Sequence, residues 1–190
     1  MKKEVREGYK MTELGEIPKE WIVAKISDCT NDIFLGLTSK VDYVENNGIP
    51  LIRTTDISDG KLNFQNVKYI SLEQHKKLTK YRKVSKGDIL VSKSGTLGSC
   101  CIVDTDREFS IYESIIAIKT NKNELKSDYL FQLLKDKKSL KRMLNNRVGG
   151  VVGHLNIKSF REILITVPTL REQEKISEIL STVDEQIDNT

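Results

Sequence analysis

The sequence predicts a mixed α+β protein (class α/β), in which a β-rich body precedes one C-terminal helix of the coiled-coil type. Short apolar runs alternate with clusters of Gly, Asn, Asp and Ser, which supply turns. Residues 169–190 instead carry apolar side chains at helical spacing. A hydrophobic fraction of 38% and a charged fraction of 31% in 190 residues indicate one globular domain with an appendage.

The body contains several expected strands and two expected helices. The strands, in chain order, are residues 21–26, 49–53, 62–70, 88–92, 98–103, 114–120 and 163–167. Ser71 and Gln74 have the Ser-x-x-Gln spacing of a capping box, so a short helix is expected over residues 72–80. Leucines recur at helical spacing after Ser127, which predicts a longer helix over residues 127–146.

The C-terminal segment begins with a clear helix start. Pro168 ends the preceding strand, Thr169 is a favourable N-cap, and Glu172 stands where a capping box requires it. We therefore divide the chain into a domain over residues 1–168 and a helix over residues 169–190. Five side chains fall at the a and d positions of a coiled coil: Gln173, Ile176, Leu180, Val183 and Ile187. This stripe either packs on the body of the chain or meets another helix.

The sequence contains no signal for a membrane, a metal or catalysis. No apolar run approaches the roughly 18 residues that cross a bilayer, and the charged N-terminus lacks an apolar h-region, so a cytoplasmic location is expected. Cys29, Cys100 and Cys101 lack CxxC spacing, which predicts reduced, packed thiols. Neither histidine has a ligand-spaced partner, and the GxSxG and GxGxxG motifs are absent. We expect no catalytic residue, no metal and no cofactor.

The net charge of +4 is divided unevenly along the chain. Residues 1–168 carry 29 basic and 21 acidic side chains, a net charge of +8. Residues 169–190 carry 2 basic and 6 acidic side chains, a net charge of -4. This asymmetry favours a polyanionic partner for the body, although a charge of +8 is also compatible with solubility alone.

Two basic clusters concentrate the positive charge. Residues 75–86 contain no acid and six cations: Lys76, Lys77, Lys80, Arg82, Lys83 and Lys86. Residues 135–147 contain only Asp136 against a second set: Lys135, Lys137, Lys138, Lys141, Arg142 and Arg147. Such density suits phosphate binding, and Tyr81 in the first cluster suits contact with a nucleic-acid backbone. The alternative is that both clusters are solvated helix faces.

Three loops have the composition of base-reading loops, because their small and polar residues allow close approach and hydrogen bonding. They cover residues 36–40, 93–98 and 147–154. The candidate contacts in them are Thr38, Lys40, Lys93, Ser94, Thr96, Arg147 and His154. Arg53 is a further candidate for a phosphate contact, but pairing with Asp56 is the safer interpretation.

Four segments follow one another in a distinctive order. They are TELGEIPKEW at 12–21, IPLIRTTDI at 49–57, KGDILVSKSGTLG at 86–98, and HLNI at 154–157 ahead of ITVPTLREQEKI at 165–176. Together they span nearly the whole chain, and the P-x-L-x-E-Q-x-x-I start of the last helix is the most specific. The chain resembles the DNA-specificity (S) subunits of type I restriction-modification systems.

This resemblance implies a non-catalytic protein that recognises double-stranded DNA. Residues 1–168 would form a target-recognition domain that reads one half of a bipartite site. Residues 169–190 would form a spacer and dimerisation helix that docks the methyltransferase subunit and, through it, the restriction subunit. Subunits of the family have two recognition domains and this chain has one. The resemblance implies a half-length form, and the chain is either a natural half-subunit, a product cut short or an excised domain. If the chain works alone, two copies paired as a homodimer through the stripe on the terminal helix would read a palindromic bipartite site.

Two alternatives remain open from the sequence. In the first, the chain is a DNA-binding module that does not discriminate between sequences and has no enzyme partner. In the second, it is an inactive remnant that also has no enzyme partner. A third and weaker option is the recognition domain of a single-chain methyltransferase, whose catalytic motif would lie outside this chain.

Overall fold

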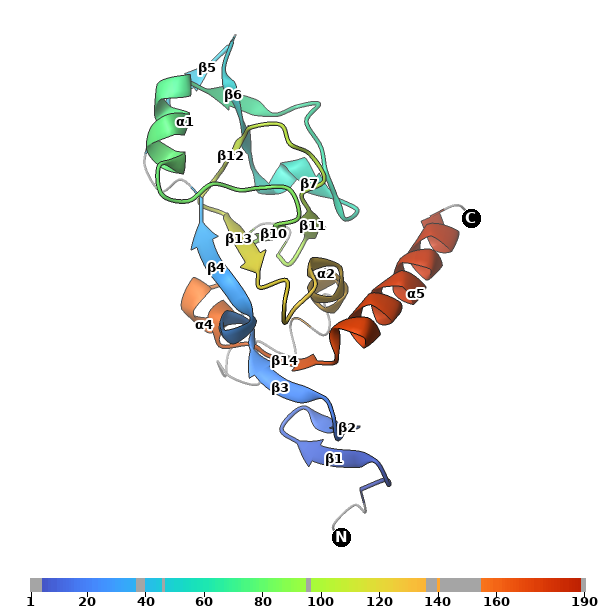
Figure 1. Ribbon diagram of the computed structural model, residues 1–190. Coiled ribbons are helices and arrows are strands. Elements are labelled where there is room, and N and C mark those ends of the chain that lie inside the picture. The colour runs from blue at the N-terminus through green and yellow to red at the C-terminus, as the bar shows by residue number, and fades with distance from the viewer. Residues whose placement is uncertain are drawn as a thin grey trace.

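The computed structural model describes residues 5–36, 40–45, 47–94, 97–135, 140 and 155–188. Two four-stranded sheets form the body, with α1 at one end and α2, α4 and α5 toward the other (Figure 1). The strands are β1 Tyr9–Thr12, β2 Gly15–Pro18, β3 Ile22–Lys25, β4 Thr30–Leu35, β5 Tyr43–Val44, β6 Ile49–Ile52, β7 Ile57–Ser58, β8 Lys61–Leu62, β9 Lys68–Ile70, β10 Ile89–Ser92, β11 Cys100–Ile102, β12 Ser110–Ile111, β13 Ile115–Thr120 and β14 Leu164–Val167. The helices are α1 Leu72–Thr79, α2 Ser127–Lys135, α4 Ile157–Arg161 and α5 Leu170–Asp188.

A central sheet with the order β11-β10-β13-β4 separates two hydrophobic cores. Successive side chains of a strand point to opposite faces of a sheet. Ile89 and Val91 of β10 accordingly pack in the core that also contains residues of α2 and β14, whereas Leu90 packs in the core with Phe34 and Phe109. Burial on both faces explains why β10 and β13 are almost continuously apolar in sequence.

The second four-stranded sheet has the order β12-β6-β9-β5 and supports α1. β12 runs parallel to β6, whereas β6, β9 and β5 are antiparallel neighbours. His75 of α1 is 3% exposed, and its Nδ1 lies 2.9 Å from the hydroxyl of Ser110 in β12. This buried contact ties the helix to the sheet, and burial lowers the pKa of His75 below the ordinary value of 6.5.

Strand β3 pairs antiparallel with β14, so the first part of the body lies beside the segment that leads into α5. The β1–β2 hairpin lies next to β3, at the end of the molecule opposite α1 (Figure 1). The indole Nε1 of Trp21, just before β3, donates to Glu172 Oε1 at 3.2 Å. The start of α5 is therefore held by a side chain that is 151 residues away in sequence.

The predicted capping box of α5 is confirmed. Thr169 Oγ1 accepts a hydrogen bond from Glu172 N at 3.4 Å, and Glu172 Oε2 accepts from Thr169 N at 3.1 Å. The hydroxyl of Thr169 also donates to Glu172 Oε2 at 2.7 Å. This hydroxyl bond and the Trp21 bond lower the pKa of Glu172. Orphan backbone donors in the first turn are thereby satisfied, as the spacing of the two residues predicts.

The mixed α+β class and most predicted elements are confirmed. The expected strands over 21–26, 49–53, 88–92, 98–103, 114–120 and 163–167 appear as β3, β6, β10, β11, β13 and β14, with shorter bounds. The expected helix over residues 72–80 appears as α1, and Gln74 N donates to Ser71 Oγ at 3.1 Å. The helix expected from Ser127 appears as α2, while residues 136–139 and 141–146 of that prediction lie outside the described residues.

One predicted strand is wrong and several elements were not predicted. Residues 62–70 do not form one strand, because β8 ends at Leu62 and β9 begins at Lys68. Between them Asn63 Oδ1 accepts from Gln65 N at 2.8 Å, which closes a local turn. The sequence analysis also missed the β1–β2 hairpin, β4, β12 and α4.

The three thiols are packed as predicted. Cys29, Cys100 and Cys101 are buried and form no disulfide bond. Burial raises the pKa of Cys101 to about 12. Among the described residues, no group of three or more His, Cys, Asp or Glu side chains is placed to hold a metal ion. No helix in the same part of the chain is long and apolar enough to cross a membrane.

We predict that Thr169→Ala destabilises the protein by about 1 kcal/mol, because the N-cap hydroxyl is lost. Thr182→Ala on the same helix is the control, since the Thr182 hydroxyl only bonds back to Glu178 O at 2.9 Å. Urea denaturation followed by circular dichroism measures both variants. Equal loss of stability in the two variants would contradict a role for the cap.

We also predict that the protein loses stability as the pH falls below 6.5. The unfolded state binds a proton on His75 near pH 6.5, whereas the folded state resists protonation until the pH is lower. The contribution of His75 is therefore complete above pH 6.5 and declines below it. Urea denaturation at a series of pH values from 7.5 to 5 should give a smaller pH dependence for His75→Asn than for the wild type. If the stability of His75→Asn depends on pH as strongly as that of the wild type, groups other than His75 cause the loss of stability.

Candidate nucleic-acid interface

Two of the three predicted loops leave the same end of the central sheet. β4 and β10 are each antiparallel to β13, so they run parallel to each other. Their last residues, Leu35 and Ser92, lie opposite Ile116 and Ile115 at the start of β13. The segments that follow, residues 36–40 and 93–98, therefore begin close together.

The third predicted loop ends at the same place. Leu155, the residue after it, donates its backbone N–H to Lys93 O at 3.0 Å, and Lys93 N donates to Ser114 O at 2.7 Å. Leu35, Lys93 and Leu155 line one pocket of about 470 Å³ together with Asn156 and Ile157. The structure thus brings the flanks of all three loops together.

The described part of the chain includes some of the predicted base contacts. Lys40 is exposed, and Lys93 and Ser94 are half-buried at the start of the second loop. Thr38, Thr96, Arg147 and His154 lie outside the described residues.

Gly36 fixes the start of the first loop against β12. A Cβ atom on this residue would lie 2.1 Å from Ile111 O and 2.4 Å from Tyr112 O, so no other residue fits the observed backbone. Its N–H donates to Ile115 O at 3.2 Å. At the far end of the loop, Lys40 O accepts from the side-chain Nε2 of Gln74 in α1 at 3.0 Å. Helix α1 therefore borders the first loop.

Residues 75–86, which we name the basic segment, run from α1 into the strand-free stretch before β10. The sequence contains no acid within the segment, but the fold brings acids to it from elsewhere. Arg82 Nε lies 3.0 Å from Asp32 Oδ2, Lys86 Nζ lies 3.8 Å from Asp106 Oδ2, and Lys83 pairs with Glu108. Lys77 pairs with Glu73 of its own helix at 2.8 Å. The hydrogen bonds from these lysines lower the pKa values of Glu108 and Glu73.

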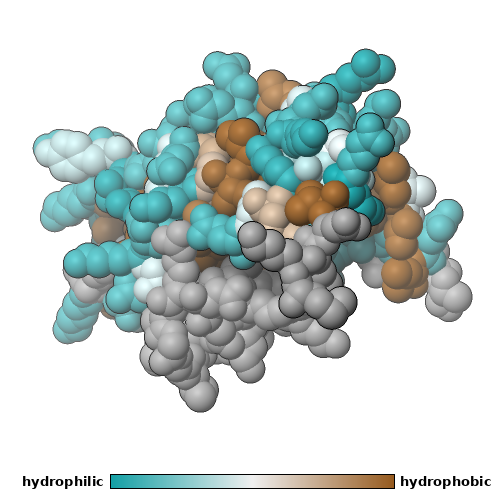
Figure 2. All heavy atoms as spheres, turned by 90° about the horizontal axis from the view of Figure 1, so that it is seen from below, coloured by the Kyte–Doolittle hydropathy of each residue, from teal (hydrophilic) through white to brown (hydrophobic). Residues whose placement is uncertain are grey.

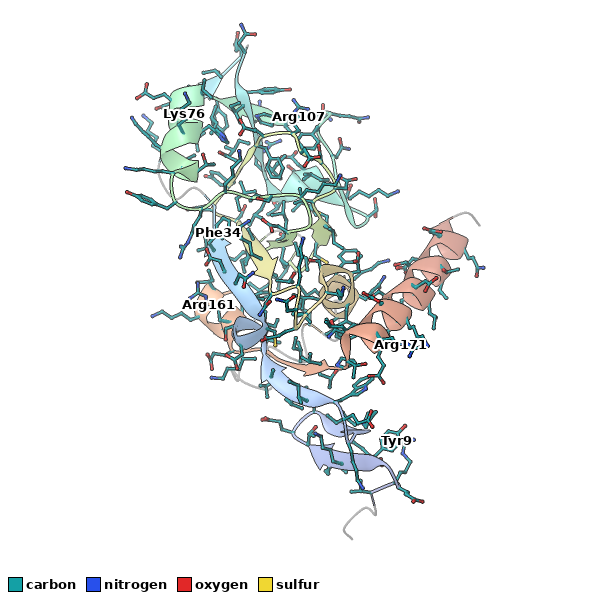
Figure 3. The ribbon with its side chains drawn as sticks, viewed as in Figure 1. Tyr9, Phe34, Lys76, Arg107, Arg161 and Arg171 are labelled. Atoms are coloured by element: carbon teal, nitrogen blue, oxygen red, sulfur yellow. The ribbon has the colours of Figure 1, made fainter. Side chains whose placement is uncertain are left out.

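The free positive charge of the basic segment is thus smaller than its sequence indicates. Within the described residues, Lys76 and Lys80 form no ion pair. Lys76 projects from α1, far from Arg171 of α5 (Figure 3). Tyr81 is 86% exposed, and Lys80 Nζ lies 5.1 Å from the centre of its ring. Lys76 and Lys80 therefore remain as unpaired cations in this part of the chain, together with the exposed ring of Tyr81. Exposed ion pairs such as Lys77–Glu73 are weak, so their lysines can exchange the carboxylate for another anion.

Two other predicted phosphate contacts are engaged within the chain. The Arg53 guanidinium donates to both carboxylate oxygens of Asp56 at 3.2 Å and to Asn66 O at 3.1 Å, which confirms the pairing interpretation. Lys135 pairs with Asp184 of α5 at 2.6 Å, and this bond lowers the pKa of Asp184. The other cations of the second cluster lie outside the described residues: Lys137, Lys138, Lys141, Arg142 and Arg147.

Helix α5 meets the body through polar side chains. Gln173 is buried, where its Oε1 accepts from Lys126 N at 2.8 Å and its Nε2 donates to Glu124 O and Pro168 O, each at 2.9 Å. Two to three turns further along α5, Ser181 and Asp184 accept hydrogen bonds from Gln132 of α2. Gln173 was predicted to face a partner helix, and this assignment is wrong, because all of its polar atoms bond within the chain.

The remainder of the predicted stripe divides between core and solvent. Ile176 packs against the core, whereas Leu180, Val183 and Ile187 are 42%, 45% and 67% exposed. Ile179, which was not predicted, is 64% exposed and extends the same face. We name Ile179, Leu180, Val183 and Ile187 the apolar stripe. Figure 2 shows hydrophobic side chains stacked at the edge where α5 lies.

The chain is similar in sequence to known proteins. The family model for the type I restriction modification DNA specificity domain matches residues 18–190. A protein of Methanocaldococcus jannaschii that carries the name MjaX specificity subunit is 31% identical over 95% of this chain and 43% of its own length. The EcoKI specificity subunit of Escherichia coli K12 is 25% identical over 93% of this chain and 39% of its own length.

The fold is also similar to solved structures. The HsdS subunit from Thermoanaerobacter tengcongensis aligns with a TM-score of 0.70 and 19% identity, covering 96% of this chain and 42% of that one. The chain therefore spans about two fifths of the length of the relatives it matches. The match over residues 18–190 establishes that this chain belongs to the type I restriction modification DNA specificity domain family.

Proposed function

We propose that this chain is a non-catalytic, cytoplasmic DNA-recognition module that reads one half of a bipartite site for a type I restriction-modification enzyme. The observation that carries the proposal is the meeting of the three loop flanks at one end of the central sheet, beside the basic segment. Polar loops would reach the base edges, while Lys76 and Lys80 would contact phosphates on either side. The specificity subunits among its relatives support this reading.

The apolar stripe of α5 also bears on how the module recognises DNA. Its four side chains are exposed, and they offer a hydrophobic face to a second copy of the chain. We propose that two copies pair through the apolar stripe of α5, so that two identical domains read a palindromic bipartite site. The paired helices would also dock the methyltransferase subunit.

We predict that binding of a short labelled duplex weakens steeply with salt. Lys76→Ala combined with Lys80→Ala should reduce the magnitude of the slope of log K against log salt by about 2, since each lost phosphate contact removes about one unit. Fluorescence anisotropy across a salt series measures the slope. Arg171→Ala combined with Lys175→Ala is the control, because it removes the same charge from exposed positions on α5. If both double variants change the slope equally, the change reflects net charge and not phosphate contacts of Lys76 and Lys80.

Sequence discrimination separates this function from indiscriminate DNA binding. The chain can be expressed together with the methyltransferase subunit of a type I system, and methylated positions in the host DNA can then be mapped. A new bipartite methylated motif is the expected outcome. Co-purification without any new motif would favour a module that binds DNA without reading it.

We predict that Val183→Asp dissociates the dimer, because it places a charge at the centre of the apolar stripe. Thr182→Asp introduces the same group at the neighbouring exposed position outside the stripe and should leave the dimer intact. Sedimentation velocity at micromolar concentrations measures both, with circular dichroism to verify that each variant is folded. A wild-type chain that sediments as a monomer would contradict the pairing.

A further inference from the structure

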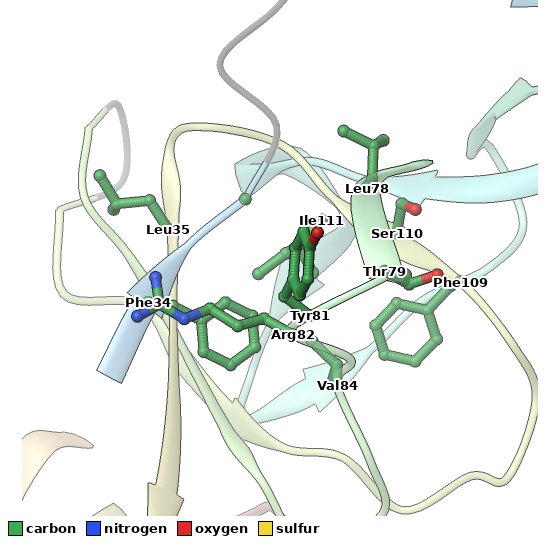
Figure 4. A pocket seen from close by; sticks show the side chains of 11 residues that line it. Phe34, Leu35, Leu78, Thr79, Tyr81, Arg82, Val84, Phe109, Ser110 and Ile111 are labelled. Atoms are coloured by element: carbon green, nitrogen blue, oxygen red, sulfur yellow. The ribbon is translucent and has the colours of Figure 1, made fainter. Parts of the chain in front are cut away.

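A pocket of about 430 Å³ lies between β4, the end of α1, the basic segment and β12 (Figure 4). Its floor is apolar, with the buried rings of Phe34 and Phe109 and the side chain of Ile111. A volume of this size is at the lower end of the range of sites for small planar molecules. The pocket opens on the surface that we assign to DNA.

The rim of the pocket is aromatic and cationic. Tyr81 lines the pocket together with Phe34 and Phe109 (Figure 4), but it is 86% exposed, whereas the other two rings are buried. The guanidinium carbon of Arg82 lies 5.9 Å from the centre of the Phe34 ring, and the ion pair with Asp32 fixes its position. A ligand with a flat apolar face and an anionic attachment complements such a rim.

Two hydroxyls that line the pocket are already engaged within the chain. The hydroxyl of Ser110 is paired with His75, and the hydroxyl of Thr79 donates to His75 O at 2.8 Å. With these two hydroxyls engaged, the aromatic rings are the main surface that the pocket offers to a base. Stacking on aromatic rings tolerates different bases, because every base has a π face.

The position of the pocket connects it to the candidate interface. Tyr81 and Arg82 belong to the basic segment, and Leu35 and Gly36 of the opposite wall lead into the first loop. A DNA strand that followed Lys76 and Lys80 would pass directly over the opening. Its occupant would be part of that strand.

We propose that this pocket holds a single nucleobase rotated out of the bound DNA, stacked against Tyr81. The proposal rests on the DNA-binding function proposed above and adds a deformation of the duplex that the loops alone do not require. An unpaired or mismatched base leaves the stack at a lower cost than a paired one. The protein should therefore prefer a duplex that contains one unpaired thymine.

The test compares two labelled duplexes of the same sequence, one fully paired and one with a single bulged thymine at its centre. The wild type should bind the bulged duplex about tenfold more tightly, in keeping with the effect of removing one stacking ring. Tyr81→Ala should lose this preference and bind the two duplexes with equal affinity. Tyr81→Phe should retain the preference.

Two further variants exclude indirect effects. Tyr43→Ala removes another exposed tyrosine, on β5 and outside the pocket lining, and should behave as the wild type. Leu78→Trp fills the pocket without changing Tyr81 and should abolish the preference. When the bulged thymine is replaced by 5-iodouracil, ultraviolet irradiation should cross-link it to the peptide that contains Tyr81, as identified by mass spectrometry.

The outcomes distinguish this proposal from the function on which it rests. Binding of the paired duplex with a steep salt slope, but with no preference for the bulge and no cross-link at Tyr81, overturns the pocket proposal and leaves DNA recognition intact. A wild-type protein that binds neither duplex contradicts DNA recognition, and the pocket proposal falls with it.

Discussion

The double pairing of β13 is the constraint on which the rest of the structure depends. It lies between β10 and β4 in a sheet that is buried on both faces. A slip of β13 by one residue would move Ala117 into the core that Ile116 now occupies, and Ile116 into the core of Ala117. Packing of the two cores therefore fixes the register of this strand. The same register aligns Leu35 and Ser92 at one end of the sheet and orients Phe34 into the core beside the pocket. Both loop convergence and pocket shape follow from it.

The elements predicted correctly are those that a few neighbouring residues determine. The apolar runs of β10 and β13 and the capping box at Thr169 and Glu172 carry their information within a few residues, and all three were predicted. β4 was missed because its first half is polar, with Asn31 and Asp32, whereas β10 and β13 are apolar from their first residue. The loops were recognised by composition alone. Their meeting point depends on which strands pair with β13, and no local pattern encodes that choice.

The ion pairs of the basic segment and the buried face of α5 also depend on residues that are distant in sequence, so local patterns did not predict them. The basic segment has no acid in its own sequence, yet Asp32, Asp106 and Glu108 reach it across the fold. On α5 the heptad spacing identified Leu180, Val183 and Ile187 correctly as a continuous apolar face. It also included Gln173, whose partners Glu124 and Lys126 lie in a segment that only tertiary structure brings near. The helix thus presents Gln173 and Ser177 beside Ile176 to its own body and leaves much of its apolar face uncovered, unlike an ordinary amphipathic surface helix.

The buried thiols have a practical consequence for chemical labelling. Cys29, Cys100 and Cys101 are the only cysteines of the sequence, and all three are shielded from solvent. Burial raises the pKa of Cys29 and, to about 12, that of Cys101, so the reactive thiolate is scarce at neutral pH. Maleimides and iodoacetamides therefore find little natural target in the folded chain. One cysteine introduced at an exposed position, such as Lys175→Cys, would carry a fluorophore or spin label selectively while the natural cysteines stay in place.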